Sequence, residues 1–418
     1  MGTGRRLTIL LLALALIGIP AVVLRIGCVG NSCRSDAAAV AAPTPFCSLP
    51  ATLRTLITDG TYDGRSPDVI GVGGSTPVVT DGVAWPSETA TARSGSIALD
   101  FVGRGIKSGR IPAEVSLDQV APTLEPLLGL HRPHPEVRAG TAVPGVVAQG
   151  AHSPLVVLVA EKGIGSTGAR PPLPPPPAGV HTAGGTAETG SVPNDPTAVE
   201  ATIGTGGLPS QHGITGAWIR NENGNVVRAF GRGSPQPVIA TLGDDLDRAT
   251  GGATKIGLVG TAVGDAGLTG DAWYSTGPVR DRTVSGGANP ADAVRGFLSR
   301  GWGADATPDL LAVALDGSQH ADATAVSSIL DEVFRAVPDA TAVVTGTGLE
   351  QTGKIATVPT PPGSDSVVGG GVFLDRSDGA TTSAEDVVAS LKADKAPDGS
   401  PLFADAFASY AVRFGRYC

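Results

Sequence analysis

From residue 155 onward, apolar residues gather in four short runs that are separated by segments with helical spacing. The runs consist mostly of Ala, Val, Leu, Ile and Gly, as in strands buried on both faces, and they cover residues 155–160, 255–260, 309–315 and 342–345. Apolar positions recur at helical spacing in residues 234–247, 291–300 and 322–337. Strands that alternate with helices form βαβ units. The pattern therefore predicts an α/β fold with a mostly parallel central sheet flanked by helices.

The segment before the first run, residues 47–145, mixes two strands with one helix. Residues 68–72 and 96–102 are short apolar stretches next to turn residues, which predicts strands. Apolar positions at helical spacing predict a helix over residues 117–130. Residues 146–418 then form the main α/β core. A loop is expected within it at residues 166–194, where six prolines fall between positions 171 and 177.

Composition and charge narrow the class of protein. The chain has 418 residues, 41% of them hydrophobic, so it can bury a sizeable core, but only 4% are aromatic. The core must therefore be built from Ala, Val, Leu and Ile. The net charge is −9, and no basic stripe with interleaved aromatic residues is visible. This excludes a nucleic-acid partner, because binding to a phosphate backbone needs such a stripe.

The first 27 residues resemble a targeting segment. Arg5 and Arg6 precede an uncharged apolar run over residues 7–24, which Arg25 closes. Such a run is long for a signal peptide and just long enough to span a bilayer. The basic start predicts that the bulk of the chain is exported. Residues 7–24 are either an anchor in the cell membrane or a cleaved signal of a secreted protein, and residues 28–46 are the linker that follows.

The four cysteines suggest disulfides, because an even number in an exported chain is typical of them. They are Cys28, Cys33, Cys47 and Cys418. Three pairings are possible. We favour Cys28 with Cys33 and Cys47 with Cys418, of which the second would tie together the two ends of the folded part.

A glycine-rich segment, residues 205–216, is the strongest candidate for chemistry. Glycines allow a tight path with backbone amides turned toward a bound group, which makes Gly206 and Gly207 candidates for binding an anion. Thr205 and Ser210 are candidate nucleophiles, and His212 can titrate near neutral pH. The alternative is a glycine-rich turn with a structural histidine.

Several motifs together resemble the alkaline phosphatase superfamily, including its type I phosphodiesterase and nucleotide pyrophosphatase branch. Residues 156–163 resemble the first core strand, which in the family ends in a metal-binding aspartate. Residues 207–216 resemble the nucleophile loop, Asp316 and His320 resemble an Asp-x-x-x-His metal pair, and residues 342–348 resemble the strand that ends in an Asp-His pair. The resemblance implies hydrolysis of phosphate esters by two zinc-like ions.

One further piece is out of order. Residues 97–109 and 115–129 are similar to the late core of that family, where a strand and a glycine turn precede an Asp-x-Ala-Pro-Thr helix. In the family this piece lies near the C-terminus, whereas here it precedes the first core strand. The resemblance therefore implies an alkaline-phosphatase-like core with a rearranged, circularly permuted order.

Departures from the family pattern decide the functional hypothesis. Lys162 stands at the first aspartate and Gly207 at the nucleophile. The Asp-His pair is replaced either by Thr347 and Gly348 or by Gly346 and Thr347. Of the expected metal ligands only Asp316 and His320 remain, too few for two divalent ions. Lys162 supplies fixed positive charge instead, either to an anion or to the neighbouring Glu161.

The leading hypothesis is an exported, membrane-tethered protein with a degenerate metal site, which binds a phosphate-containing ligand or a partner protein of the cell envelope. The alternative is an active metal-dependent phosphomonoester or phosphodiester hydrolase, with zinc or manganese as cofactor. A third hypothesis makes the fold a structural scaffold only.

Overall fold

The structure is a computed structural model that describes residues 45–74, 76–87, 97–163, 173, 175–260, 262–270, 281–284, 289–316, 322–348, 358–377, 379–414 and 418. By its internal contacts the chain divides into Met1–Thr44, which lies outside the described residues, and one compact unit, Pro45–Cys418. The predictions for residues 7–24, Cys28 and Cys33 therefore lie outside the described residues. Within the described ranges, no helix combines the length and the apolar character needed to cross a bilayer.

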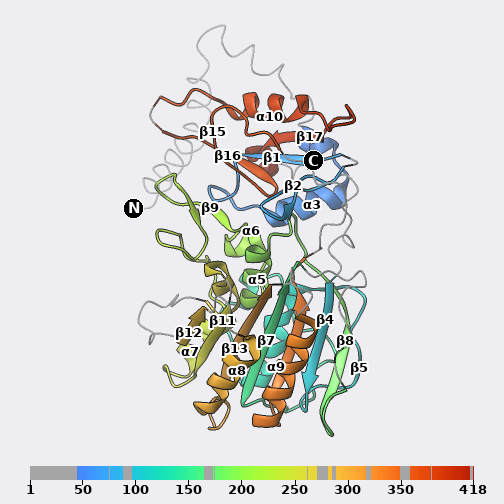
Figure 1. Ribbon diagram of the computed structural model, residues 1–418, viewed down its shortest axis with the longest axis vertical. Coiled ribbons are helices and arrows are strands. Elements are labelled where there is room, and N and C mark those ends of the chain that lie inside the picture. Colours follow the sequence, from blue (N-terminus) through green and yellow to red (C-terminus); the bar gives the residue numbers. More distant parts are fainter. Residues whose placement is uncertain are drawn as a thin grey trace, which may run out of the picture. The chain divides into compact units, whose positions relative to one another are not determined.

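A mixed, mostly parallel sheet forms the centre of the unit, as predicted (Figure 1). Nine strands of the described chain take part, in the order β12 (Asp281–Val284), β11 (Ile256–Gly260), β13 (Asp309–Asp316), β7 (Leu155–Lys162), β14 (Thr341–Gly346), β4 (Ile97–Gly103), β8 (His181–Glu188) and β5 (Gly109–Arg110), with β6 (Val115–Ser116) also beside β8. The first five run parallel to one another, and β4 is antiparallel to both of its neighbours.

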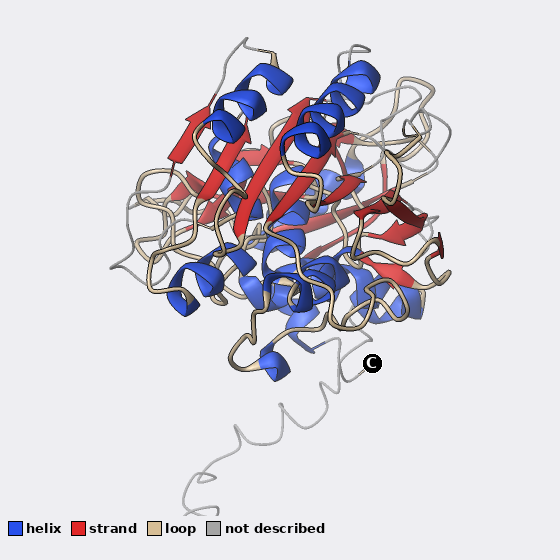
Figure 2. Cartoon of the chain, turned by 90° about the horizontal axis from the view of Figure 1, so that it is seen from below, coloured by secondary structure: helices blue, strands red, loops and turns tan. Residues whose placement is uncertain are grey.

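Helices cover both faces of this sheet (Figure 2). On one face, α8 (Pro290–Ser299) and α9 (Asp322–Ala336) pack against the odd-numbered residues of β7 and β13. On the other face lie α5 (Pro196–Thr205), α7 (Leu242–Ala249) and α4 (Val120–Leu124), against the even-numbered residues. The sheet core is built mainly from Val, Leu, Ile and Ala, as the low aromatic content requires.

Four strands of the described residues form a second, antiparallel sheet, which the sequence analysis did not anticipate. Its order is β15 (Ser364–Val368), β16 (Gly371–Leu374), β1 (Val69–Gly73) and β17 (Phe403–Ala408). The predicted strand at residues 68–72 exists as β1, but it joins this sheet and not the central one. Helices α10 (Ala384–Ala393), α3 (Ala51–Gly60), α2 (Pro45–Ser48) and α11 (Tyr410–Phe414) lie around it.

The remaining elements are short. Two hairpins pair β2 (Val79–Thr80) with β3 (Val83–Ala84) and β9 (Trp218–Arg220) with β10 (Val226–Arg228). One further helix, α6 (Pro209–His212), and the 3-10 turns η3 (Leu117–Gln119), η4 (Pro126–Leu128), η5 (Pro135–Val137) and η6 (Val263–Leu268) complete the assignment.

Three local predictions need correction. Residues 117–130 form η3, α4 and η4 instead of one helix, because Pro126 has no amide to donate and Gly129 turns left-handed at φ 60°. The helix predicted at 234–247 begins only at Leu242, after Thr241, whose side chain accepts from the Asp244 amide. The predicted loop at 166–194 contains strand β8, because residues 181–187 pair antiparallel with β4 in spite of their two glycines.

The disulfide between Cys47 and Cys418 confirms the favoured pairing of these two cysteines. The sulfur atoms are 2.02 Å apart and the Cα atoms 5.4 Å apart. Beside the bond, the rings of Phe46 and Phe407 meet edge to face at 5.1 Å. The bond thus fixes α2 and the C-terminal residue to the edge of the second sheet.

Candidate functional site

The carboxyl ends of β7 and β13 bring Lys162 and Asp316 together. The two residues end neighbouring parallel strands and are paired in register. Both are even-numbered, so strand alternation places their side chains on the face that α5 covers. Glu161 precedes Lys162 and therefore points to the opposite face. In open α/β sheets, the carboxyl ends of parallel strands are the usual place for a ligand.

Two carboxylates from other elements complete this group, which we call the Lys162 cluster: Lys162, Glu200, Asp265 and Asp316. The ammonium of Lys162 donates a hydrogen bond to Asp265 Oδ1, and it lies 3.9 Å from Glu200 Oε1. Asp265 also accepts, through Oδ2, from the amide of Ala262 at 2.9 Å. Asp265 follows β11 within η6, and Glu200 lies in the middle of α5.

Glycines make this meeting possible. A Cβ atom at Gly204 would lie 2.1 Å from the carbonyl oxygen of Gly267, and one at Gly267 would lie 2.7 Å from the amide nitrogen of Ala201. Such distances exclude any larger side chain at these two positions. Helix α5 therefore approaches η6 backbone to backbone, which places Glu200 and Asp265 on the same ammonium.

Glu200 and Asp265 are buried and Lys162 is largely so, whereas Asp316 is exposed. Burial alone would lower the pKa of Lys162, but the charges of Glu200 and Asp265 outweigh burial and raise it above the usual value. Asp316 adds a smaller contribution in the same direction. Lys162 is therefore a permanent internal cation at neutral pH. The side chain of Lys162 is 18% exposed, and that of Asp265 is 1% exposed.

Glu200 is the most enclosed carboxyl group of the cluster. Its side chain is fully buried, and among the described residues neither of its oxygens has a hydrogen-bond partner. Burial raises the pKa of Glu200 well above its ordinary value, although the charge of Lys162 acts against this shift, and the nearby charges of Asp265 and Asp195 act in the same direction as burial.

Asp195 connects the cluster to the glycine-rich segment. It is the N-cap of α5, where Oδ1 accepts from the amide of Thr197 at 2.8 Å, and Oδ2 accepts from the amide of Ala217 at 2.9 Å. Burial raises the pKa of this carboxyl group, although its hydrogen bonds with the backbone act against the shift. Asp195 therefore positions the start of α5 and the end of residues 205–216 relative to each other.

The glycine-rich segment uses Thr205 and His212 internally. The Thr205 hydroxyl is fully buried, donates to the carbonyl of Ala201 at 2.6 Å and accepts from the amide of Gly207 at 3.2 Å. His212 is also fully buried. Its Nδ1 accepts from the Ile214 amide, and its Nε2 lies 3.1 Å from the hydroxyl of Thr202. Both ring nitrogens are thus engaged without Ser210, and burial lowers the pKa of His212 to about 3.

Gly206 and Gly207 end α5 and do not reach Lys162. Gly206 adopts the left-handed conformation that closes the helix, and its amide donates to the carbonyl of Thr202. Gly206 lies six positions after Glu200, which is about 9 Å along the axis. Lys162 therefore approaches the middle of α5, whereas Gly206 and Gly207 lie at its C-terminal end.

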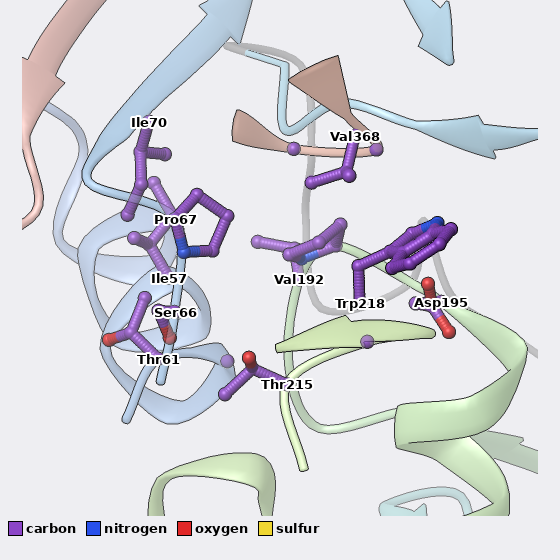
Figure 3. A pocket seen from close by; sticks show the side chains of 15 residues that line it. Ile57, Thr61, Ser66, Pro67, Ile70, Val192, Asp195, Thr215, Trp218 and Val368 are labelled. Atoms are coloured by element: carbon purple, nitrogen blue, oxygen red, sulfur yellow. The ribbon is translucent and has the colours of Figure 1, made fainter. Parts of the chain in front are cut away.

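Ser210 is the residue of the segment that faces an open space. It lines a pocket of about 460 Å³ together with residues of α3, of the turn after α3 and of α11. We call this space the Ser210 pocket. Next to it lies a smaller cavity of about 20 Å³, which shares Thr61 and Ser66 with the pocket (Figure 3).

The predicted metal ligands are only partly visible. Asp316 is exposed at the end of β13, whereas His320 lies outside the described residues. Thr347 and Gly348 follow β14, where the amide of Thr347 donates to the carbonyl of Glu161. Within the ranges that the structure describes, no three His, Cys, Asp or Glu side chains are arranged to hold a metal ion.

Comparison of the chain with family models, with curated proteins and with solved structures finds no match. The alkaline-phosphatase resemblance therefore depends on the motifs alone.

Sequence reasoning identified neither Glu200 nor Asp265 as a site residue. Asp265 caps η6 and also binds Lys162. A signal for Glu200 was present, because it is the single charged residue in an otherwise apolar or small helix, Pro196–Thr205. A helix of mostly apolar and small residues is expected to be buried, so its one carboxyl group is expected to be buried too. Buried carboxyl groups are rarely without a partner.

Proposed function

We propose that this protein is an exported, membrane-tethered binding protein of the cell envelope, built on an alkaline-phosphatase-like scaffold whose metal site has been replaced by an internal cation. The observation that supports this proposal is the ammonium of Lys162, which is held by Asp265 and Glu200 beside Asp316. In the resembled family, the position of Lys162 is a metal-binding aspartate.

The charge of Lys162 replaces part of what a metal ion would supply, but not its chemistry. An ammonium is a hydrogen-bond donor with a single charge, and it has no open coordination position at which water could be activated. A divalent ion at this place would also be repelled by the lysine. The protein is therefore proposed to bind its ligand without cleaving phosphate esters.

The cluster also weighs against Lys162 as the binding group for a phosphate. Its positive charge already faces Asp265, and Asp316 lies in register beside it. An incoming phosphate would meet these carboxylates at the same place, at a Coulomb cost that grows as water is excluded. We therefore place ligand binding in the Ser210 pocket, which is open.

Metal content and turnover test the proposal directly. The purified chain should contain less than stoichiometric zinc and manganese by elemental analysis. It should not hydrolyse aryl phosphate monoesters or diesters when either metal is added. Stoichiometric metal, together with turnover that Asp316→Ala abolishes, would instead establish the metal-dependent hydrolase.

A charge reversal sharpens the test. Lys162→Asp removes the ammonium and adds a fourth carboxylate to the cluster, and oxygen ligands of this kind suit Mn²⁺. We expect the variant, and not the parent chain, to bind about one equivalent of Mn²⁺ in equilibrium dialysis. The matched control is Lys392→Asp, which changes the same charge at an exposed lysine of α10 paired with Asp405. A Lys162→Asp variant that folds but binds no metal would contradict the view of Lys162 as a replacement for the ion.

A further inference from the structure

Most of the described residues that line the Ser210 pocket carry a hydroxyl group. Six of the described residues around it carry one: Thr58, Thr61, Tyr62, Ser66, Ser210 and Ser409. A hydroxyl group can donate and accept a hydrogen bond at the same time. Such a lining complements a ligand that is itself rich in hydroxyl groups.

Several of these hydroxyl groups keep hydrogen-bonding capacity for a ligand. Thr61 donates its proton to the carbonyl of Thr58 at 3.1 Å, which leaves the lone pairs of its oxygen. Ser66 accepts from the amide of Tyr62 at 2.8 Å, which leaves its proton. One acceptor and one donor therefore lie five residues apart on the same wall of the pocket.

The described residues that line the pocket carry one negative and one positive charge. Among the described residues that line it, the charged side chains are Asp63 and Arg413, which form an ion pair with each other at the exposed rim. The described lining residues therefore carry no net charge that would attract an anionic or a cationic ligand. A neutral ligand can accept from Arg413 and donate to Asp63 while the two remain paired.

Size and aromatic content agree with this chemistry. A volume of about 460 Å³ lies in the range of small-molecule pockets. Tyr62 contributes an amphipathic ring, with an apolar face for C–H groups and a polar tip. Its ring is held by the guanidinium of Arg65, 5.2 Å from the ring centroid.

The smaller cavity next to the pocket contains an unused polar group. The hydroxyl of Thr215 faces this cavity, is buried within a residue that is 6% exposed, and has no hydrogen-bond partner among the described residues (Figure 3). A volume of about 20 Å³ holds one water molecule or one hydroxyl group. Because Thr61 and Ser66 line both spaces, a hydroxyl group of a ligand in the pocket would lie near this cavity.

We propose that the Ser210 pocket binds a neutral sugar, as a free saccharide or as part of an envelope glycan. This inference names the ligand class of the binding site suggested under the proposed function and rests on that proposal. Turnover of phosphate esters would contradict the proposed function, whereas failure to bind sugars would contradict only this inference.

The test uses a panel of neutral hexoses and disaccharides and the same sugars carrying a phosphate. Binding to the purified chain is measured by saturation-transfer difference NMR and by titration calorimetry. At least one neutral sugar should bind, and its phosphorylated form should bind no better. No binding of any neutral sugar at a concentration of about 50 mM, far above a 1 mM dissociation constant, would overturn the inference. A preference for the phosphorylated form would overturn it too.

Two variants locate the site. Ser210→Phe fills the pocket with a ring, and Tyr62→Ala removes its aromatic wall. We expect each to weaken sugar binding at least 10-fold while the melting temperature stays close to that of the parent chain. Ser328→Phe, at a half-buried serine on α9 that does not line the pocket, is the matched control and should bind normally. Sugar binding that survives Ser210→Phe unchanged would place the ligand elsewhere.

Discussion

The Lys162 cluster and the Ser210 pocket divide between them what an enzyme site would combine. The cluster holds reactive groups, an ammonium and three carboxyl groups, but they are mostly buried and engage one another. The pocket has open space, but most of the described residues that line it carry a hydroxyl group, and its charged side chains, Asp63 and Arg413, form a pair. Catalysis needs charged groups that converge on an accessible substrate. Their separation here agrees with the proposal that the pocket binds a ligand and that the cluster stabilises the fold.

The largest expected effect is the loss of the internal cation. Lys162→Met leaves Asp265 and Glu200 buried without it, so the free energy of unfolding should fall by about 4 kcal/mol, as for other broken buried pairs. Urea denaturation of the parent chain and of the variant measures the difference. Lys392→Met removes an exposed ion pair and should cost less than about 1 kcal/mol.

A double-mutant cycle tests whether that loss comes from the pair itself. Asp265→Asn should cost clearly less in the Lys162→Met background than in the parent chain, because its cation is already gone. Additive effects would show that the two residues stabilise the fold independently. The view of the cluster as a set of groups that stabilise one another would then be wrong.

Removal of the disulfide should affect the pocket more than the cluster. Cys47 and Cys418 are 371 positions apart, and the bond limits the conformational freedom of the unfolded chain. Replacing both cysteines by serine should lower the free energy of unfolding by about 3 kcal/mol. Because α11 forms one wall of the pocket, hydrogen exchange should rise first in Tyr410–Phe414 and last in β7. A uniform rise over the whole unit would show that the bond does not act locally.

His212 should make stability depend on pH. Its pKa is about 3 in the folded state and about 6.5 when unfolded, so the unfolded chain takes up a proton first as the pH falls. The stabilisation is complete above pH 6.5 and is lost as the pH falls toward 3. Between pH 7 and pH 5 this group alone should reduce the free energy of unfolding by about 2 kcal/mol.

The contribution of His212 is isolated by comparison with His212→Gln at each pH. Buried carboxyl groups with raised pKa values, such as Glu200 and Asp195, change stability in the opposite direction and are common to both chains. The parent should therefore lose about 2 kcal/mol more than the variant between pH 7 and pH 5. Parallel pH curves would mean that His212 is accessible to protons in the folded state.

The smallest expected effect on stability is that of Ser210→Ala. Ser210 is half-buried at the pocket, so the free energy of unfolding should change by less than about 0.5 kcal/mol, while the affinity for the sugar should fall measurably. A large loss of stability would assign Ser210 to the packing of α6 instead of to a ligand.

The strands of the central sheet could be predicted because each is a buried apolar run. β7, β11, β13 and β14 begin and end within two residues of the predicted runs. The second sheet could not be predicted, because β1 pairs with strands about 300 residues further along the chain, and such pairing leaves no local pattern.

The candidate site shows the same limit. Its residues on strand ends, Lys162 and Asp316, were found from the sequence. Glu200 and Asp265 reach them only because Gly204 and Gly267 let α5 approach η6 so closely. Likewise, Ser210 was recognised within its loop. The pocket it faces depends on α3 and α11, which are far away in sequence and were not predicted to meet.

The bond between Cys47 and Cys418 turns nearly the whole described unit into a covalent ring. A protease that cuts one peptide bond of this ring opens it without releasing a fragment, since both pieces stay joined through the sulfur atoms. Two cuts are needed before any segment can leave, so a chain that is cut once in a surface loop keeps all of its residues in one covalent molecule.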